Sequence, residues 1–542
     1  MKATLVALSL AAVGATAAPA GLERAASGLA GIRPRALTAG VRFLASDVLE
    51  GSAAGTRSHE VAELYVAAEF QAAGLEPAGD EGSFTQAVPI RAWRVDQDSA
   101  ALAVQAPGQR PVSLTRGIDF VALSDGEHSE VEIEAPVVFA GYAISAPEFG
   151  YDDLRGADLR GRIAVVLYGA PLSDRPNFFP PAAHAAYADP TDKLRRLAER
   201  GAAGALFVHT PEEEGMLPWS TLARRAREEE MGWLEGPRLG AAVGGVPARG
   251  VLSMQGLERL LLAAGVGGGA RAILEKADAG KLSPQAWKVR ARLRSSTETR
   301  ELTSRNVVGL LRGSDPASSS EVVIVSAALG PRGYGDPLAA PARTTDGAPA
   351  LSVLLEVARA LAGLPTPPRR SVLFLVVTTG GQGPVGSRFF ALHPTVARER
   401  IVADLHIDGT PTVLPFQEAI AHAAGHSTLS GPVGTAAAAL GVELSPEPVA
   451  GASASACPDL YSFVRQGIPS ACITPEEKGV GHGERGSAGP PGDAGWDWEA
   501  LARFARLQFL VAFLVADDAG LPRWNRGDFF ERFALRSLPT TR

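Results

Sequence analysis

Few residues of this chain have the type and spacing that metal binding or acid–base chemistry needs. His406 and Asp408 stand two residues apart, at the end of the apolar segment 401–407. Side chains two apart on a β-strand project from the same face, so both groups could act on one atom. With His482 or Glu484, from a glycine-rich segment, they could hold a single metal ion. A histidine on a strand is also commonly a structural residue, and both interpretations remain open.

The remaining polar candidates favour structural roles. Asp346 precedes a helical pattern and suits a helix N-cap. His422 and His426 lie near a predicted helix, where histidines are commonly surface or supporting groups. The sequence has no Gly-x-Ser-x-Gly turn, no Walker-type phosphate loop and no cysteine paired with histidine at a known spacing. These absences argue against serine hydrolases, P-loop enzymes and cysteine nucleophiles.

The only two cysteines of the chain are Cys457 and Cys472. Between them we expect a short helix at 459–465 and a strand at 470–474. About nine helical residues rise roughly 13 Å and about four strand residues return a similar distance, so the two sulfurs could lie level. In an oxidising compartment such a pair predicts a disulfide, and the alternative is two buried thiols.

Strands alternating with helices are predicted after residue 306. Nearly continuous apolar runs predict buried strands at 322–327, 372–377, 401–407 and 471–474. The helical patterns between and after them, at 351–361 and from 497 onward, carry their apolar residues on one face. This alternation predicts an α/β sheet with helices on both faces and ligands at the carboxyl ends of its strands.

The first half of the chain has a different pattern of predicted helices and strands. Helices are predicted at 37–45 and 58–73. From 130 to 295 short strands separated by turns surround a helix at 191–199, which indicates a small mixed unit inserted into the chain.

Composition limits the class of protein. The chain has 542 residues, 46% of them hydrophobic and 20% charged, and a net charge of −7. Two or three domains are expected at this length, and the acidic balance argues against a nucleic-acid partner. The first twenty residues have the charge, apolar run and small residues of a secretory signal peptide. No later apolar run is long enough to span a membrane, so a periplasmic or extracellular location is expected.

Several segments resemble the di-zinc aminopeptidase family, which includes bacterial leucyl-type aminopeptidases, glutamate carboxypeptidases and transferrin receptor. The matching segments, in the family's order, are 354–361, 370–375, 386–390, 461–467 and 524–530. Segments 138–142, 151–153 and 161–163 resemble the protease-associated (PA) domain that several members carry.

The resemblance implies a zinc-exopeptidase-like α/β fold, with a mixed sheet, helices on both faces and an inserted protease-associated lid domain. It divides the chain into a signal peptide (1–20), an N-terminal segment that packs on the peptidase-like domain (34–129), the PA insert (130–295) and the peptidase-like α/β domain (300–530).

In this family two zinc ions share an aspartate, and a glutamate acts as the general base. Carried over by position, the base falls on Gly381 and the ligands fall on Ala328, Thr345, Gln382, Asp408 and Gly486. Only Asp408 is a suitable ligand, and a catalytic zinc needs about three protein ligands. The resemblance therefore predicts no catalytic base, no metal ion and no other cofactor in this chain, although the family uses two zinc ions.

We expect a catalytically inactive aminopeptidase-like protein of the cell envelope that binds or scaffolds, as transferrin receptor does. Its partner would be a protein or peptide that the sequence does not identify. The alternative is an active metallo-exopeptidase, an aminopeptidase with a rearranged metal site around His406 and Asp408.

Overall fold

The computed structural model describes most of the chain. The described residues are 20–50, 52–171, 179, 181–235, 238–239, 245–279, 283–330, 347–379, 383–410, 415–447, 457–476 and 496–537. Residues 1–19 of the predicted signal peptide lie outside them. None of the described helices is long and apolar enough to cross a membrane.

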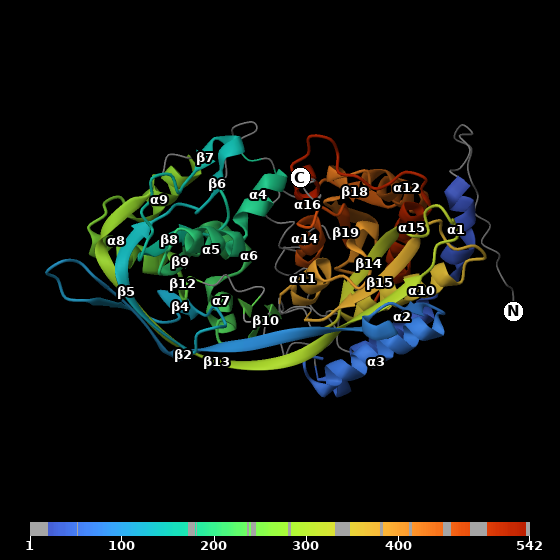
Figure 1. Ribbon diagram of the computed structural model, residues 1–542, viewed down its shortest axis with the longest axis horizontal. Helices are drawn as coiled ribbons and strands as arrows, with labels where there is room; N and C mark the ends of the chain where they lie inside the picture. Colours follow the sequence, from blue (N-terminus) through green and yellow to red (C-terminus); the bar gives the residue numbers. More distant parts are fainter. Residues whose placement is uncertain are drawn as a thin grey trace.

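Two lobes lie side by side and share one long antiparallel ribbon (Figure 1). The ribbon pairs β2 (Thr85–Gln105) with β13 (Gln285–Leu311), and it runs along the base of both lobes. Buried and exposed residues alternate along much of both strands, which is the pattern of strands with one face turned toward a core.

The first lobe is built on a mixed sheet. Its strand order is β1–β13–β15–β14–β16–β19–β17–β18, and the pairs within β15–β14–β16–β19 are parallel. The strands that follow β13 are β14 (Val322–Ala328), β15 (Ser371–Val377), β16 (Ile401–Ile407), β17 (Glu418–His422), β18 (Glu443–Ser445) and β19 (Ser470–Pro475), and β1 (Glu76–Pro77) is at the edge. The nearly continuous apolar runs arise because helices cover both faces of the central strands.

One face of this sheet carries the larger helical layer. Its helices are α1 (Ala20–Gly31), α2 (Pro34–Leu44), α3 (Arg57–Ala72), α10 (Ala348–Ala362) and α15 (Trp498–Asp517), and they share one core with the odd-numbered residues of β14 and β16, such as Val325 and Leu405. Helix α15 is buried along nearly its whole length, which explains its mostly apolar sequence.

The opposite face carries α11 (Val385–Leu392) and α14 (Pro458–Val464). Phe390 of α11 and Phe463 of α14 pack against the even-numbered residues of β14, such as Ile324. The predicted α/β fold, with a mixed sheet and helices on both faces, is confirmed.

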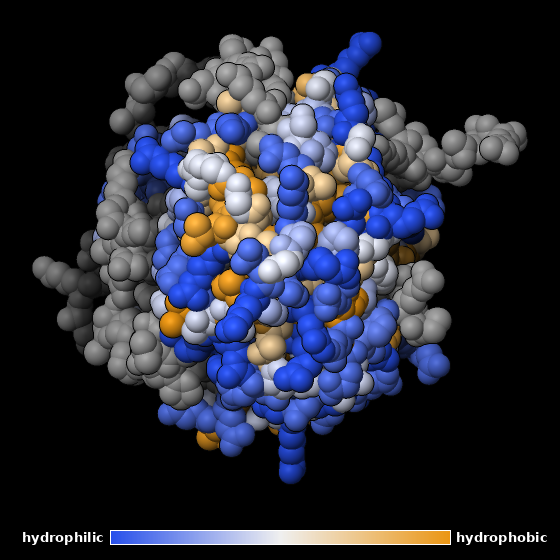
Figure 2. All heavy atoms as spheres, turned by 90° about the vertical axis from the view of Figure 1, so that its left-hand side faces the viewer, coloured by the Kyte–Doolittle hydropathy of each residue, from blue (hydrophilic) through white to orange (hydrophobic). Residues whose placement is uncertain are grey.

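The second lobe has its own core. It contains β4 (Phe120–Leu123), β5 (Glu130–Phe139), β8 (Ile163–Leu167), β9 (Gly204–Val208) and β12 (Ala248–Leu252), with α5 (Pro190–Glu199), α8 (Met254–Ala264) and α9 (Gly269–Asp278) around them. On the outer face of this lobe, apolar residues lie scattered among hydrophilic ones (Figure 2).

Residues 95–123 contribute to the core of the second lobe, although the sequence analysis began the inserted domain only at residue 130. Val95, Leu102, Leu114 and Phe120 pack into the core of the second lobe. The reason is β2, which begins beside the first lobe and ends inside the second, so no single residue on it separates the two packing environments.

Candidate functional site

The carboxyl ends of the central strands form the edge where the sequence analysis places a site. Because β14, β15 and β16 are parallel, Ala328 at the end of β14 and Asp408 just after β16 lie at this same edge. The other positions carried over from the family, Thr345, Gly381, Gln382 and Gly486, lie outside the described residues, as do Asp346, His482 and Glu484.

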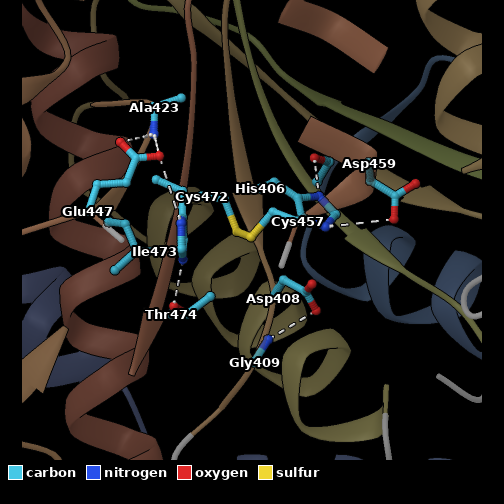
Figure 3. The surroundings of a disulfide bond; sticks show 12 residues. His406, Asp408, Gly409, Ala423, Glu447, Cys457, Asp459, Cys472, Ile473 and Thr474 are labelled. Carbon is cyan, nitrogen blue, oxygen red and sulfur yellow. Dashed lines mark hydrogen bonds and ion pairs between the residues drawn. A yellow bond between two sulfur atoms is a disulfide. The ribbon is translucent and has the colours of Figure 1, made fainter. Parts of the chain in front are cut away.

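Asp408 is 8% exposed, and its Oδ1 accepts a hydrogen bond from the backbone N–H of Gly409 at 3.0 Å (Figure 3). Ala328 offers no ligand atom. A hollow of about 10 Å³ beside Leu329 and Gly330 is close to the smallest space that holds one water molecule.

His406 belongs to a buried polar group on the α11 and α14 side of the sheet. Its Nδ1 lies 3.0 Å from Ser326 Oγ on β14, and Ser326 Oγ donates to Asp404 Oδ1 at 2.8 Å. Burial raises the pKa of Asp404 well above its usual value, which favours the protonated carboxyl in the folded protein.

The other ring nitrogen of His406 faces α14. Nε2 lies 3.9 Å from Asp459 Oδ2 (Figure 3). Asp459 Oδ1 accepts a hydrogen bond from Ser387 Oγ at 2.5 Å. Since both ring nitrogens have polar neighbours and the side chain is 1% exposed, this arrangement is that of a structural histidine.

Another buried histidine reaches the same strand-end edge from α3. His59 Nε2 lies 3.0 Å from Oγ1 of Thr378, which follows β15, and His59 Nδ1 lies 2.7 Å from the Ser52 carbonyl oxygen. Burial lowers the pKa of His59, against the opposing charge of Glu63. The sequence analysis missed His59, because a helix N-cap by Thr56 gives no sign of contact with a strand more than 300 residues away.

His422 and His426 both lie near the carboxylate of Glu447, on the side of β19 that is away from β16. Glu447 lies 3.9 Å from His422 Nδ1 and 4.0 Å from His426 Nε2, and its two oxygens accept from the Ala423 N–H at 3.2 Å. Burial lowers the pKa of His426, but the 2.8 Å contact from its Nδ1 to Asp528 Oδ2 and the charge of Glu447 together oppose this, and the net shift is upward.

The cysteine pair considered in the sequence is joined by a disulfide. Cys457 is the N-cap of α14 and Cys472 lies on β19, with their Cα atoms 6.6 Å apart and both side chains buried (Figure 3). Cys472 is in register with His406 on β16. The disulfide therefore fixes the start of α14, which carries Asp459, beside His406.

The described residues at the strand ends do not fit a catalytic zinc ion. Such an ion takes about three nitrogen, sulfur or oxygen ligands from the protein and keeps one position open. Asp408 supplies one carboxylate, Ala328 supplies no ligand, and His406 lies within the buried group described above.

A different group of described residues could hold a metal ion. Asp125, Glu127 and His128 each offer a ligand atom, and these atoms all lie within 4.8 Å of one another. Asp125 Oδ1 accepts from the backbone N–H groups of Glu127 and His128, and Oδ2 lies 2.7 Å from His128 Nδ1. These contacts are also those of an Asx turn, which needs no metal.

Comparison with known proteins gives one family and a set of solved structures. Residues 306–499 match the model of "Peptidase family M28". The aminopeptidase from Aneurinibacillus sp. strain AM-1 is 16% identical, covers 92% of this chain and 100% of its own, and superposes with a TM-score of 0.54. No curated protein matches the sequence.

Two further structures are similar at lower TM-scores. The peptidase M28 precursor from Shewanella amazonensis is 17% identical, with coverage of 93% and 97% and a TM-score of 0.46. The zinc aminopeptidase BSAP from Bacillus subtilis is 15% identical, with coverage of 90% and 97% and a TM-score of 0.43.

These matches correct one expectation. The sequence analysis expected no cofactor, and this is wrong: the match of residues 306–499 to peptidase family M28 points to zinc, and the Asp125, Glu127 and His128 group offers ligands. The expectation failed because it considered only the positions carried over from the family's own site.

The resemblance to the di-zinc aminopeptidases is confirmed by the matched model and by the fold. Residues 306–499 of this chain are similar to peptidase family M28.

Proposed function

We propose that this protein is a non-hydrolytic member of the M28 fold that binds or scaffolds a protein or peptide in the cell envelope. The observation that carries the proposal is the strand-end edge, where Ala328 stands at the end of β14 and offers no ligand atom. Gly381, at the position of the family's general base, has no side chain that could accept a proton.

Peptide hydrolysis by this fold requires an activated water and stabilisation of the tetrahedral intermediate. Each contribution is commonly worth several kcal/mol of the barrier. A glycine at the base position supplies neither, and Asp408 alone cannot position a zinc ion for attack on a carbonyl. The helices and strands around the edge remain well packed, which supports a retained folded role.

We also propose that the protein is exported and that its second lobe is a protease-associated domain inserted between the ends of the ribbon. The signal-like sequence at 1–20 and the Cys457–Cys472 disulfide support export, because disulfides persist mainly in oxidising compartments. The net charge of −7 disfavours a nucleic-acid partner.

A peptidase assay tests the central claim. The purified protein should give background hydrolysis of aminoacyl-4-nitroanilides, with and without added Zn²⁺, beside an active aminopeptidase as the positive control. Gly381→Glu alone should stay at background, because one carboxylate restores the base without the ligands.

The contrary result would be Zn²⁺-dependent turnover by the unaltered protein. If Asp408→Ala abolished this turnover and the exposed control Asp98→Ala preserved it, the chain would be an active exopeptidase with replacement ligands around Asp408.

A further inference from the structure

A cavity of about 240 Å³ lies at the junction of the two lobes, and neither Ala328 nor Asp408 lines it. Its wall comes from three parts of the chain: Tyr168 and Phe207 of the second lobe, Trp93 and Trp233 of strands paired at the ribbon, and Arg388 of α11. A cavity of about 150 Å³ can hold benzene, so this one accommodates a ring with several further atoms.

The cavity has a guanidinium with unused hydrogen-bonding capacity. The Arg388 side chain is 25% exposed, and its nearest carboxylate is Asp189 Oδ2, at 3.7 Å from Nη2. Asp189 already pairs with Arg465 and accepts from the Thr191 N–H at 2.7 Å. Among the described residues the Arg388 guanidinium therefore has no hydrogen-bond acceptor, although it is largely removed from bulk water.

A carboxylate also reaches the cavity. Glu230, on β10 (Glu230–Glu235), retains exposed surface while it lines the cavity. Burial raises the pKa of Glu230. The Trp93 indole and the charge of Arg249 oppose this shift. Glu230 therefore presents accessible surface at the lining of the cavity.

Aromatic side chains also line the cavity. Trp233 is 1% exposed, its ring lies edge-on to Phe389, and its Nε1 has no hydrogen-bond partner among the described residues. Tyr168 and Phe207 stack with their ring centroids 4.8 Å apart. The Trp233 nitrogen has almost no accessible surface, so Trp233 contributes apolar ring surface to the cavity.

We propose that this cavity binds a free α-amino acid with an aromatic or large aliphatic side chain. The carboxylate of the ligand pairs with Arg388, its ammonium lies at Glu230 and against the indole faces, and its side chain fills the apolar part of the cavity. The proposal does not depend on whether the strand-end edge hydrolyses peptides.

Binding of L-phenylalanine to the full-length protein tests this. Titration calorimetry and quenching of tryptophan fluorescence should both saturate, because Trp93 and Trp233 line the cavity. Phenethylamine, which lacks the carboxylate, and 3-phenylpropanoate, which lacks the ammonium, should each bind more than tenfold more weakly.

Two variants test the roles of Arg388 and Glu230 separately. Arg388→Gln should weaken L-phenylalanine more than tenfold and leave phenethylamine unchanged, and Glu230→Gln should weaken L-phenylalanine while leaving 3-phenylpropanoate unchanged. Arg195→Gln, an exposed arginine of α5 outside the cavity, is the matched control and should bind as the unaltered protein does.

The melting temperatures of both charge variants should match that of Arg195→Gln, which would exclude a folding defect as the cause of weaker binding. No saturable binding of L-phenylalanine by the unaltered protein, or equal binding by Arg388→Gln, would overturn the proposal. Neither outcome bears on the peptidase assay, so the two proposals fail separately.

Discussion

Ser326 Oγ on β14 and His406 Nδ1 on β16 lie 3.0 Å apart between two neighbouring parallel strands, within a sheet whose other side chains on this face are mostly apolar. The serine also donates to Asp404, so one hydroxyl connects an acid and an imidazole that have no access to solvent.

Removal of that hydroxyl should destabilise the first lobe. Ser326→Ala leaves Asp404 and the His406 Nδ1 without their shared partner, and an unsatisfied buried polar group costs about 1–3 kcal/mol. Urea denaturation should report a loss in this range. Ser113→Ala, at an exposed position of β3 (Val112–Leu114), should change the free energy of unfolding by less than about 0.5 kcal/mol.

Asp404 should make stability depend on pH. Its pKa is raised in the folded protein, so between the unfolded value of about 4 and the raised value the folded state holds a proton that the unfolded state has lost. The contribution of this carboxyl is complete at low pH and decreases as pH rises through that window. Asp404→Asn should remove this decrease in denaturation curves measured from pH 4 upward, and the exposed control Asp47→Asn should retain it.

Lys193 should have the opposite effect in the second lobe. It is fully buried, and its Nζ donates to the carbonyl oxygens of Leu167 at 2.8 Å and Gly169 at 2.5 Å. Burial lowers its pKa to about 7, with Asp153 and Glu213 opposing the shift.

Above about pH 7 folded Lys193 is therefore neutral, while the unfolded chain keeps the proton to about pH 10. The free energy of unfolding should rise with pH across this interval by the Lys193 contribution. Lys193→Met should lack this contribution, and the exposed control Lys276→Met should preserve it. An identical pH profile for all three proteins would contradict the assignment.

The disulfide should contribute measurably to stability. Cys457 and Cys472 are 15 residues apart in sequence, and closing such a loop stabilises the folded state by about 3 kcal/mol in the chain-entropy model. The double variant Cys457→Ser, Cys472→Ser should lose a similar amount in chemical denaturation. Reduction of the unaltered protein should give the same loss, which separates the covalent link from the effect of the serine side chains.

The elements that bury continuous apolar runs could be predicted from the sequence. The strands predicted at 322–327 and 372–377 are β14 and β15 within one residue at each end. The ribbon strand β13 was predicted only as part of the short strands expected up to residue 295, because segments such as 296–301 are mostly polar and lack the apolar pattern of a strand. Their pairing depends on a partner strand 200 or more residues earlier, which local periodicity does not reveal.

The buried polar group was only partly predictable. The alternation Asp404, His406, Asp408 places three polar side chains on one face, and this pattern could have identified Asp404. Asp459 comes from a helix on another segment, and its approach to His406 follows from the packing of α14 against β16 and β19. No spacing along the chain encodes that contact.

The ribbon also determines how separable the second lobe is. The chain leaves the first lobe on β2 and returns on β13, and Val95 is paired with Thr297 where the two strands enter the second lobe. The entry and exit of the lobe are thus adjacent, as the ends of independently folding insertions usually are. Residues between 95 and 297 therefore leave and re-enter the ribbon at one place, so a short hairpin turn could replace them while the sheet of the first lobe keeps its strand order.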